Sequence, residues 1–497
     1  MKTFSISILG CRVNQYEAEQ IAAALKRRGL RQVDSPGGDL RVIHTCSVTS
    51  QAAKGSRQTI RRATRLPVLG QIACDNPDAG AGDHRDPGID LQSQTPQLPD
   101  TSSRARVVVT GCWATSDTVA AGQMPGVDAV ITNHQNVNDR LIELLNEWTP
   151  PDDASVTGDV TQPPTTNRPT SLPILGHKPA THQRAFLKIQ DGCDAHCTYC
   201  IIPQLRPVLS SKSPDDAVAE ARALVAAGHR EIVLTGIFMG AYGQSTALRR
   251  RQDKSTSKPL AGLVAALCTQ VPGLTRLRLS SLEPGDLDEH LINELKRHPQ
   301  VVPHFHLPLQ SGSDAILRKM NRQYTSGQFL EMIAMVQDAF DEPAITTDII
   351  VGFPNETDDE FARTLDVVDR VQFIHTHAFS YSPRPKTAAA RWTDQYVDGR
   401  VANQRIHLLN DRAKQHSLAY RQRFVGRAVS VIVERSDADH SPDRSPDKSR
   451  DKSSVHHGRC ERYFDVHFAS PTAHAGDLVQ LRVDSVTADR TQGSVIE

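Results

Sequence analysis

The sequence has no long apolar run and no excess of charge of either sign. Nothing in its 497 residues approaches the roughly 18 consecutive apolar residues of a membrane-spanning helix, so we expect no membrane partner. The 57 basic and 57 acidic residues cancel, so any nucleic-acid surface has to be local. Residues 1–8 alternate like a β-strand and lack the apolar run of a signal peptide.

Disulfides are also not expected. Nine cysteines in a long chain without a signal run predict a reducing compartment, the cytoplasm. In that setting clustered cysteines indicate metal binding or catalysis more often than disulfides. The length predicts several domains, because one hydrophobic core rarely serves more than about 250–300 residues.

Three of the cysteines, Cys193, Cys197 and Cys200, lie on one short loop. Three thiolates at this spacing can converge on one cubic iron–sulfur cluster and leave one iron without a protein ligand. Such an open iron is a reaction site, as is the open position of a catalytic metal. The alternatives are a disulfide or a zinc site in which His196 is the fourth ligand.

Residues 1–147 predict an N-terminal open α/β sheet. Its expected strands are Phe4–Leu9, Leu40–Thr45, Arg106–Thr110 and Val127–Ile131, and its expected helices are Gln15–Arg28, Ser50–Arg65 and one that ends near Glu147. Cys11, Cys46 and Cys112 then fall at the carboxyl ends of strands, where parallel α/β sheets bind ligands. They are metal-ligand candidates, although a cysteine can also be just a small buried hydrophobe.

Two segments interrupt this pattern. Residues 70–105 read as an insertion in which Cys74 has no role, and residues 148–180 read as a linker. The expected second helix carries one basic stripe, which either contacts RNA phosphates or is a solvated face. The stripe consists of Lys54, Arg57, Arg61 and Arg65.

Residues 181–417 predict a partial parallel barrel of about six strands, a (βα)6 unit. The expected strands are Ala185–Gln190, Glu231–Thr235, Arg276–Ser280, Phe305–Leu309, Thr346–Val351 and Phe373–Phe379. Glycines and polar residues collect after these strands, and their recurrence favours a cofactor pocket, although each one alone is equally typical of a turn or cap. The candidates are Gly236, Glu283, Gln310, Ser311 and Gly352.

Residues 418–497 predict a small β-barrel, with strands Val425–Glu434, Tyr463–Phe468 and Asp477–Val483. Residues 436–459 read as an insertion in which His456 and His457 are solvated rather than metal ligands. Arg421, Arg423 and Arg427 are candidates for phosphate contacts. The alternative is a packing domain that only closes the larger barrel. Cys268 and Cys460 receive no role.

Several motifs together resemble the methylthiotransferases of the radical S-adenosylmethionine (SAM) superfamily. The motifs are Gly10–Glu17, His44–Thr49, Val109–Cys112, Cys193–Pro203, Leu307–Ser313, Asp348–Pro354 and Tyr381–Arg384. They cover nearly the whole chain apart from three insertions, and their combination is far more specific than the cysteine loop alone.

The resemblance implies two 4Fe-4S clusters. Cys193, Cys197 and Cys200 would hold the cluster that binds SAM and cleaves it to a radical, with Tyr199 beside the adenine or the cluster, or else in the core. Cys11, Cys46 and Cys112 would hold a second cluster that carries the transferred sulfur. An electron donor such as flavodoxin or ferredoxin is implied, the sulfur donor is left open, and the last domain resembles the RNA-binding TRAM module.

Within the family, Val13–Glu17 and Phe379–Pro385 are most similar to the branch that modifies threonylcarbamoyladenosine at tRNA position 37. Alternatives are isopentenyladenosine in tRNA, a ribosomal protein, a radical SAM reaction of another kind, and a non-enzymatic RNA-binding or iron-sensing protein. One departure stands out. After Arg206 the family commonly has several arginines, whereas this chain has Pro207–Lys212, which could alter the grip on tRNA.

Overall fold

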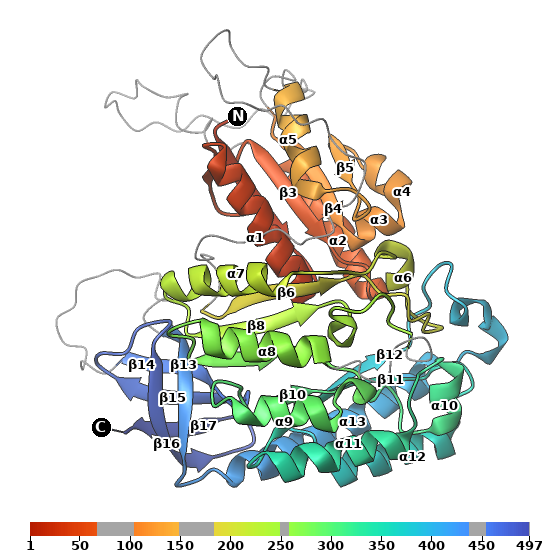
Figure 1. The fold of residues 1–497 in the computed structure, drawn as a ribbon. Coiled ribbons are helices and arrows are strands. Elements are labelled where there is room, and N and C mark those ends of the chain that lie inside the picture. The colour runs from red at the N-terminus through yellow and green to blue at the C-terminus, as the bar shows by residue number, and fades with distance from the viewer. Residues whose placement is uncertain (67–103, 149–182, 249–257, 437–453, 497) are drawn as a thin grey trace, which may run out of the picture. The chain divides into compact units, whose positions relative to one another are not determined.

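A computed structural model describes residues 1–66, 104–148, 183–248, 258–436 and 454–496 (Figure 1). The chain divides into two compact units, Met1–Arg168 and Pro169–Glu497. Nearly all of the predicted linker and of the first insertion, with Cys74, lies outside the described residues. In the parts that are described, every helix is too short or too polar to cross a bilayer.

The first unit is built on a five-stranded parallel sheet in the order β2-β1-β3-β4-β5. The strands are β1 (Thr3–Ile8), β2 (Arg31–Gln32), β3 (Leu40–Thr45), β4 (Arg106–Gly111) and β5 (Ala129–Ile131), and the helices are α1 (Arg12–Arg27), α2 (Ser50–Arg65), α3 (Cys112–Ser116), α4 (Thr118–Gly122) and α5 (Val137–Trp148). The predicted open sheet is confirmed. The sequence did not predict β2, α3 and α4, because two to five residues carry too little periodicity.

Each face of this sheet has its own apolar core. Phe4 and Val42 pack with Ile21 of α1 and Leu144 of α5 on one face. On the other face, strand residues pack against α2 and α3 through Ile60 and Trp113. Because both faces are covered, the central strands β3 and β4 are buried along almost their whole length, as is typical of parallel sheets.

The second unit contains the predicted partial barrel. Its parallel strands are β6 (Ala185–Asp191), β8 (Glu231–Gly236), β9 (Arg276–Leu279), β10 (His304–His306), β11 (Ala344–Val351) and β12 (His375–Ser380). Isolated parallel bridges, Leu277 to Val301 and Ser281 to His306, join the β9 side to the β10 side. The short β7 (Ser210–Ser211) pairs antiparallel with β6. The (βα)6 prediction is therefore confirmed.

Helices follow the strands around this barrel (Figure 1). They are α6 (Ile202–Leu205), α7 (Pro214–Ala226), α8 (Lys258–Gln270), α9 (Glu289–Arg297), α10 (Asp314–Lys319), α11 (Ser326–Ala339), α12 (Asp358–Val371) and α13 (Gly399–Gln422). Their starts are encoded locally, since Ser213 caps α7, and Thr325 and Thr357 form capping boxes for α11 and α12.

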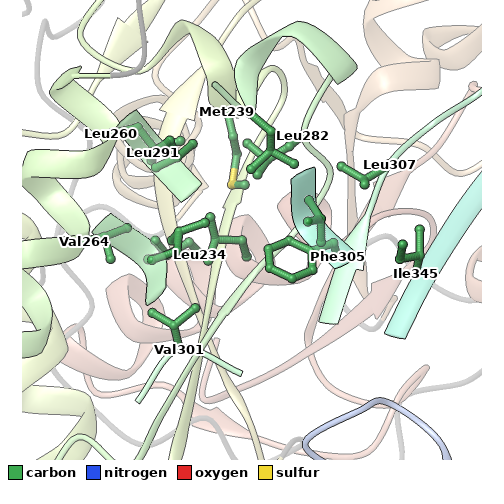
Figure 2. Packing of buried hydrophobic residues seen from close by; sticks show 14 of the residues in the cluster. Leu234, Met239, Leu260, Val264, Leu282, Leu291, Val301, Phe305, Leu307 and Ile345 are labelled. Carbon is green, nitrogen blue, oxygen red and sulfur yellow. The ribbon is translucent and has the colours of Figure 1, made fainter. Parts of the chain in front are cut away.

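One large apolar cluster fills the space between the barrel strands and the helices. Figure 2 shows Leu260, Val264 and Leu291, from α8 and α9, gathered near Leu234 of β8. Phe305 and Ile345 belong to the same cluster. Because side chains alternate along a strand, the residues between these positions face the barrel interior. On β10, β11 and β12 those interior residues are mostly polar.

The last domain is a closed five-stranded barrel in the order β13-β14-β15-β17-β16. Its strands are β13 (Ala428–Ser436), β14 (Ser454–Cys460), β15 (Asp465–Ser470), β16 (Leu478–Val486) and β17 (Thr491–Val495). The predicted small β-barrel is confirmed. The boundary predicted at 417/418 falls inside α13 and stays a prediction.

The predicted insertion 436–459 is wrong at its end, because residues 454–459 belong to β14. His456 is buried rather than solvated, with Nε2 3.0 Å from the Ser470 carbonyl oxygen and its ring stacked on Phe468. His457 is half-buried. The polar composition of this strand hid it, because its buried alternate positions include a histidine and a glycine.

The last barrel packs on the strand starts of the partial barrel. Arg278 donates to the Glu461 carbonyl oxygen at 3.0 Å and to the Glu231 carboxylate at 2.7 Å. The Tyr463 ring stacks on His304 at 4.2 Å between centroids. Buried guanidinium groups thus satisfy backbone carbonyls across this contact, which fixes the two barrels to each other.

Of the predicted phosphate contacts in this region, that of Arg421 needs correction, whereas those of Arg423 and Arg427 stay predictions. Arg421 is buried and donates to Thr491 Oγ1 at 3.0 Å and to the Ala488 carbonyl oxygen at 2.9 Å. Arg423 and Arg427 are more exposed, but they pair with Glu342 and Asp341, at 3.0 and 2.8 Å. The packing role that the sequence left open therefore accounts for the contacts of Arg421.

Replacing Glu231 with Gln is expected to lower the free energy of unfolding by about 3–5 kcal/mol, because buried Arg278 loses its carboxylate partner. Burial raises the pKa of Glu231, but Arg278, Arg184 and Arg276 together lower it from 4.5 to about 2. A carboxyl group whose pKa is lower in the folded state than in the unfolded state stabilises the folded state. This stabilisation is complete above the unfolded-state pKa and is lost as the pH falls toward 2.

Urea unfolding at pH 7, and at points from pH 5 down to pH 3, measures this effect. The difference between the wild type and Glu231→Gln is expected to shrink as the pH falls. Exposed Glu331 on α11 provides a matched control, Glu331→Gln, which should stay close to the wild type. Equal losses in both variants, or a difference that does not change with pH, would contradict this account.

Candidate functional site

The first candidate site lies at the carboxyl edge of the first sheet. Cys11 follows β1 and occupies the N-cap position of α1, Cys46 follows β3 directly, and Cys112 follows β4 and begins α3. The strands β1, β3 and β4 are neighbours, and they end in register because Ile8 pairs with His44 and Thr45 pairs with Gly111. The predicted positions at three adjacent strand ends are therefore confirmed; their role as ligands stays a prediction.

Two polar side chains tie these strand ends together. Asn14 donates to the carbonyl oxygens of Leu9 and Thr45 at 2.7 and 3.0 Å, which joins the ends of β1 and β3. Thr45 Oγ1 accepts from the Ala114 N–H at 3.1 Å, beside Cys112. Ser56 of α2 accepts from the Cys46 N–H at 3.1 Å. These hydrogen bonds hold the backbone that carries the three cysteines.

The thiols at this edge differ in their surroundings and in their exposure. A Cβ atom on Gly10 would lie 2.8 Å from Cys46 Sγ, and residue 10 has φ +105°, so only glycine lets that thiol pass beside the backbone that precedes Cys11. Asn133 Nδ2 donates to Cys112 Sγ at 3.7 Å. Cys46 and Cys112 are buried, whereas Cys11 is exposed.

The second candidate site is the loop that follows β6. Buried Asp191 anchors it: the carboxylate accepts from Lys188 at 3.0 Å, from Arg206 at 2.9 Å and from the Gly192 N–H at 2.8 Å. Gly192 has φ +84°, and a Cβ there would lie 2.0 Å from the Val208 carbonyl oxygen. Any side chain at this position would therefore displace the start of the cysteine loop.

The three thiols of the loop lie within electrostatic range of one another. Burial raises the pKa of Cys193 and of Cys200 to about 12, and Cys197 raises both further. Cys193 Sγ accepts the Ala195 N–H at 3.4 Å. Without iron these two thiols are neutral, and binding to a metal would remove their protons.

Arg322, which the sequence analysis missed, is the polar neighbour of this trio. Its buried guanidinium donates to Cys197 Sγ at 3.2 Å and pairs with the Glu283 carboxylate. It thus links a candidate cluster ligand to a candidate SAM contact. A single arginine in the turn after α10 has no spacing signature, and only the fold brings it beside the loop.

The structure places the other predicted cofactor residues around the same strand ends. The Tyr199 ring meets Phe353 edge-on at 6.3 Å between centroids, and Arg322 Nη1 lies 3.5 Å from its hydroxyl. Gly236 ends β8, and a Cβ there would lie 3.1 Å from Gln190 Cβ. Gln310 follows β10 with φ +62°. These placements suit a ligand-facing rim, and the contacts to SAM stay predictions.

Two candidates also have structural reasons for their identity. Ser311 is buried, with its hydroxyl 3.4 Å from Thr364 Oγ1. Gly352 has φ +69°, and a Cβ there would lie 2.9 Å from Ala402 Cβ on α13. The packing at these two positions is enough to explain why they are Ser and Gly. Their predicted contacts to SAM therefore rest only on their position in the fold.

Two basic residues of the altered stretch, Arg206 and Lys212, form buried ion pairs. Arg206 is buried in its ion pair with Asp191, so it supports the loop rather than an RNA surface. Lys212 is equally buried and pairs with Glu220 of α7.

The basic stripe of α2 is mostly exposed, at Lys54, Arg61 and Arg65. Its fourth member, Arg57, is half-buried and lies over the Trp113 ring, 5.9 Å from the ring centroid.

The chemistry of the two donor sets suits iron–sulfur clusters. Among the described residues, no group of three or more His, Cys, Asp or Glu side chains converges closely enough to hold one metal ion. A cubic cluster takes each thiolate on a different iron, so its three ligands stand farther apart. Both trios consist of thiols alone, which are the ligands that these clusters take.

Comparisons with known proteins agree with this arrangement. The Radical SAM superfamily profile matches residues 187–368, and the profile of "Uncharacterized protein family UPF0004" matches residues 3–74. The solved radical S-adenosylmethionine methyltransferase TsrM from Kitasatospora setae has a similar fold, with a TM-score of 0.50 at 13% identity over 78% of this chain and 74% of that chain.

Curated relatives match over most of their length. The threonylcarbamoyladenosine tRNA methylthiotransferase MtaB of Bacillus subtilis is 33% identical, over 88% of this chain and 86% of the relative. MtaB of Thermotoga maritima is 30% identical, over 87% of both chains. The tRNA-2-methylthio-N(6)-dimethylallyladenosine synthase of a Parafrankia species is 34% identical, over 88% of this chain and 78% of the relative. The chain therefore belongs to the radical SAM methylthiotransferase family.

Proposed function

We propose that this enzyme adds a methylthio group to threonylcarbamoyladenosine at position 37 of tRNA. The observation that carries the proposal is the placement of two cysteine trios. Each trio lies at the carboxyl end of parallel strands, and that is where such folds bind ligands and carry out chemistry. A reaction that both activates an inert C–H bond and inserts sulfur needs two such centres.

The residues of the chain have distinct parts in this proposal. Cys193, Cys197 and Cys200 hold a 4Fe-4S cluster with SAM, and Cys11, Cys46 and Cys112 hold a second 4Fe-4S cluster. When bound, these groups supply the radical and sulfur chemistry that side chains cannot. Asp191 and Gly192 shape the cysteine loop, and Arg322 places a positive charge between Cys197 and Glu283.

The choice of substrate rests on local sequence. Val13–Glu17 and Phe379–Pro385 are most similar to the threonylcarbamoyladenosine branch, and the two MtaB relatives carry that name. The second candidate is isopentenyladenosine, which the similar identity to the Parafrankia enzyme favours. Within Val13–Glu17, Asn14 ties strand ends and Glu17 pairs with His44 at 3.1 Å, so this motif shapes the first site rather than contacting a distant base.

The basic stripe of α2 supports tRNA as the partner. Exposed Lys54, Arg61 and Arg65 lie on the helix that follows Cys46, where phosphate contacts would hold RNA beside the first site. A low-potential electron donor such as flavodoxin or ferredoxin completes the reaction.

Nucleoside mass spectrometry tests this function. Anaerobically reconstituted protein, given SAM, reductant and sulfide, should convert threonylcarbamoyladenosine in tRNA to its 2-methylthio form and leave tRNA with isopentenyladenosine unchanged. Deleting the gene from its host should remove the same nucleoside. Conversion of isopentenyladenosine alone would contradict the proposed substrate.

A further inference from the structure

The end of α10 and the turn after it are tied to the cysteine loop by hydrogen bonds. Thr198 donates through its N–H to the Met320 carbonyl oxygen at 3.1 Å and through its hydroxyl to the Lys319 carbonyl oxygen at 2.8 Å. Asn321 Nδ2 donates to the His196 carbonyl oxygen at 3.1 Å. These three bonds fix the turn beside the middle cysteine of the loop.

Arg322 follows this turn, and three groups surround its guanidinium. Nη2 donates to the Glu283 carboxylate, and Nη1 donates to Cys197 Sγ at 3.2 Å. The guanidinium also lies over the Tyr324 ring, with its central carbon 5.0 Å from the ring centroid. Only 6% of the Arg322 side chain is exposed. A charged donor that is shielded from water in this way makes stronger hydrogen bonds than an exposed one.

The groups that hold this guanidinium are themselves fixed. Glu283 and Asp286 form a capping box, in which the Glu283 N–H donates to the Asp286 carboxylate at 2.9 Å and the Glu283 carboxylate accepts from the Asp286 N–H. Tyr324 is buried, and its hydroxyl lies 2.9 and 3.0 Å from the carbonyl oxygens of Pro308 and Leu309. The fold therefore sets the direction in which the guanidinium points its N–H group at the sulfur.

A charged N–H donor at a cluster ligand affects the two redox states of the cluster differently. Hydrogen bonds to the sulfur atoms are among the features that set the reduction potential of an iron–sulfur cluster. The reduced state carries one more negative charge than the oxidised state, so a nearby positive donor stabilises the reduced state more. A higher reduction potential follows.

We propose that Arg322 raises the reduction potential of the cluster held by Cys193, Cys197 and Cys200, through its hydrogen bond to Cys197 Sγ. This inference rests on the proposed function, which assigns a 4Fe-4S cluster to the loop. Arg322 acts through a ligand of the cluster, so it is a positioning residue. The higher potential allows a low-potential donor such as flavodoxin or ferredoxin to reduce a larger fraction of the clusters.

Redox titration followed by electron paramagnetic resonance measures this potential without SAM or tRNA. A reference protein in which Cys11, Cys46 and Cys112 are replaced by Ala leaves only the loop cluster to titrate. In this background, Arg322→Met is expected to lower the equilibrium constant for one-electron reduction by about 10-fold, which equals about 59 mV. Arg322→Lys keeps a charged donor on a flexible stem but lacks the planar fork, so it should restore part of the loss.

Two comparisons separate the hydrogen bond from general effects of charge and folding. Arg318→Met, at an exposed arginine of α10, is the matched control and should have the potential of the reference protein. Combining Arg322→Met with Glu283→Gln removes one charge of each sign and leaves the net charge unchanged. This double variant should keep most of the downward shift, because the donor to the sulfur is still absent.

The possible outcomes distinguish this inference from the proposed function. An unchanged potential in Arg322→Met, or a double variant with the potential of the reference protein, overturns the inference and leaves the proposed function standing. Loss of iron from both Arg322→Met and Arg322→Lys also overturns it, because Arg322 would then be needed to hold the cluster rather than to set its potential. A reference protein without a cluster in the loop contradicts both claims.

Discussion

Replacing Cys197 with Ala is expected to abolish SAM cleavage while the thiols of the first sheet keep their cluster. Loss of a hydrogen-bonding neighbour of a metal ligand typically costs 10–100-fold, so loss of the ligand itself should cost more than about 100-fold. Cys197 also accepts a hydrogen bond from Arg322, so the variant removes a ligand together with one of the partners of this buried guanidinium. Formation of 5′-deoxyadenosine under strict reduction measures the effect.

Cys268→Ala is the matched control for this experiment, because Cys268 is a buried thiol of α8 that packs in the apolar core and belongs to neither site. It should cleave SAM at the wild-type rate. SAM cleavage by Cys197→Ala at a rate close to that of the control would show that the loop does not hold the cluster that binds SAM.

Replacing Cys46 with Ala is expected to separate the two halves of the reaction. The loop after β6 is untouched, so SAM cleavage should continue, whereas methylthiolated product should fall by more than about 100-fold. The backbone of residue 46 should hold its place, since Ser56 bonds its N–H and its carbonyl oxygen at 3.1 and 2.9 Å. The measurement pairs 5′-deoxyadenosine with the modified nucleoside in the same sample.

Full product formation by Cys46→Ala would remove this cysteine from the first site. A parallel loss of SAM cleavage would mean that the variant damages the protein more broadly. Asn14→Ala offers a second comparison, because it loosens the ends of β1 and β3 without deleting a thiol. Its product yield should fall less than that of Cys46→Ala.

Much of this architecture could be predicted from the sequence because it depends on local patterns. The strands that precede Cys11, Cys46 and Cys112 show alternating or continuous apolar residues, so their hydrophobic pattern located them. Ser213 followed by Pro214 marked the start of α7 in the same way. Strand ends in parallel sheets are equivalent, which is why three distant cysteines could be assigned to one edge.

The parts that could not be predicted depend on contacts between distant segments. β14 is polar in sequence, and only its place in a closed barrel buries His456. Arg421 was a candidate for phosphate binding, but the packing of α13 against β17 buries it. Arg322 reaches Cys197 across 125 residues of sequence. The contacts of such residues can be recognised only once the fold has brought distant segments of the chain together.

The polar interior of the barrel was missed for a related reason. His306 and His377 are 71 residues apart in numbering, and each alone reads as a histidine in a strand. Register pairs Asp348 with His377, and the contact between His306 and Asp348 joins β10 to β11. This group of polar side chains is therefore a product of strand pairing rather than of any linear motif.

Iron and acid-labile sulfide analysis of anaerobically purified protein, together with electron paramagnetic resonance, tests the central claim that each cysteine trio holds its own cubic cluster. The wild type should contain about eight irons and eight sulfides per chain. Variants that lack either trio should each retain about half, with distinct spectra. A wild type with only half this iron, or a loss of all iron when one trio is removed, would contradict two independent clusters.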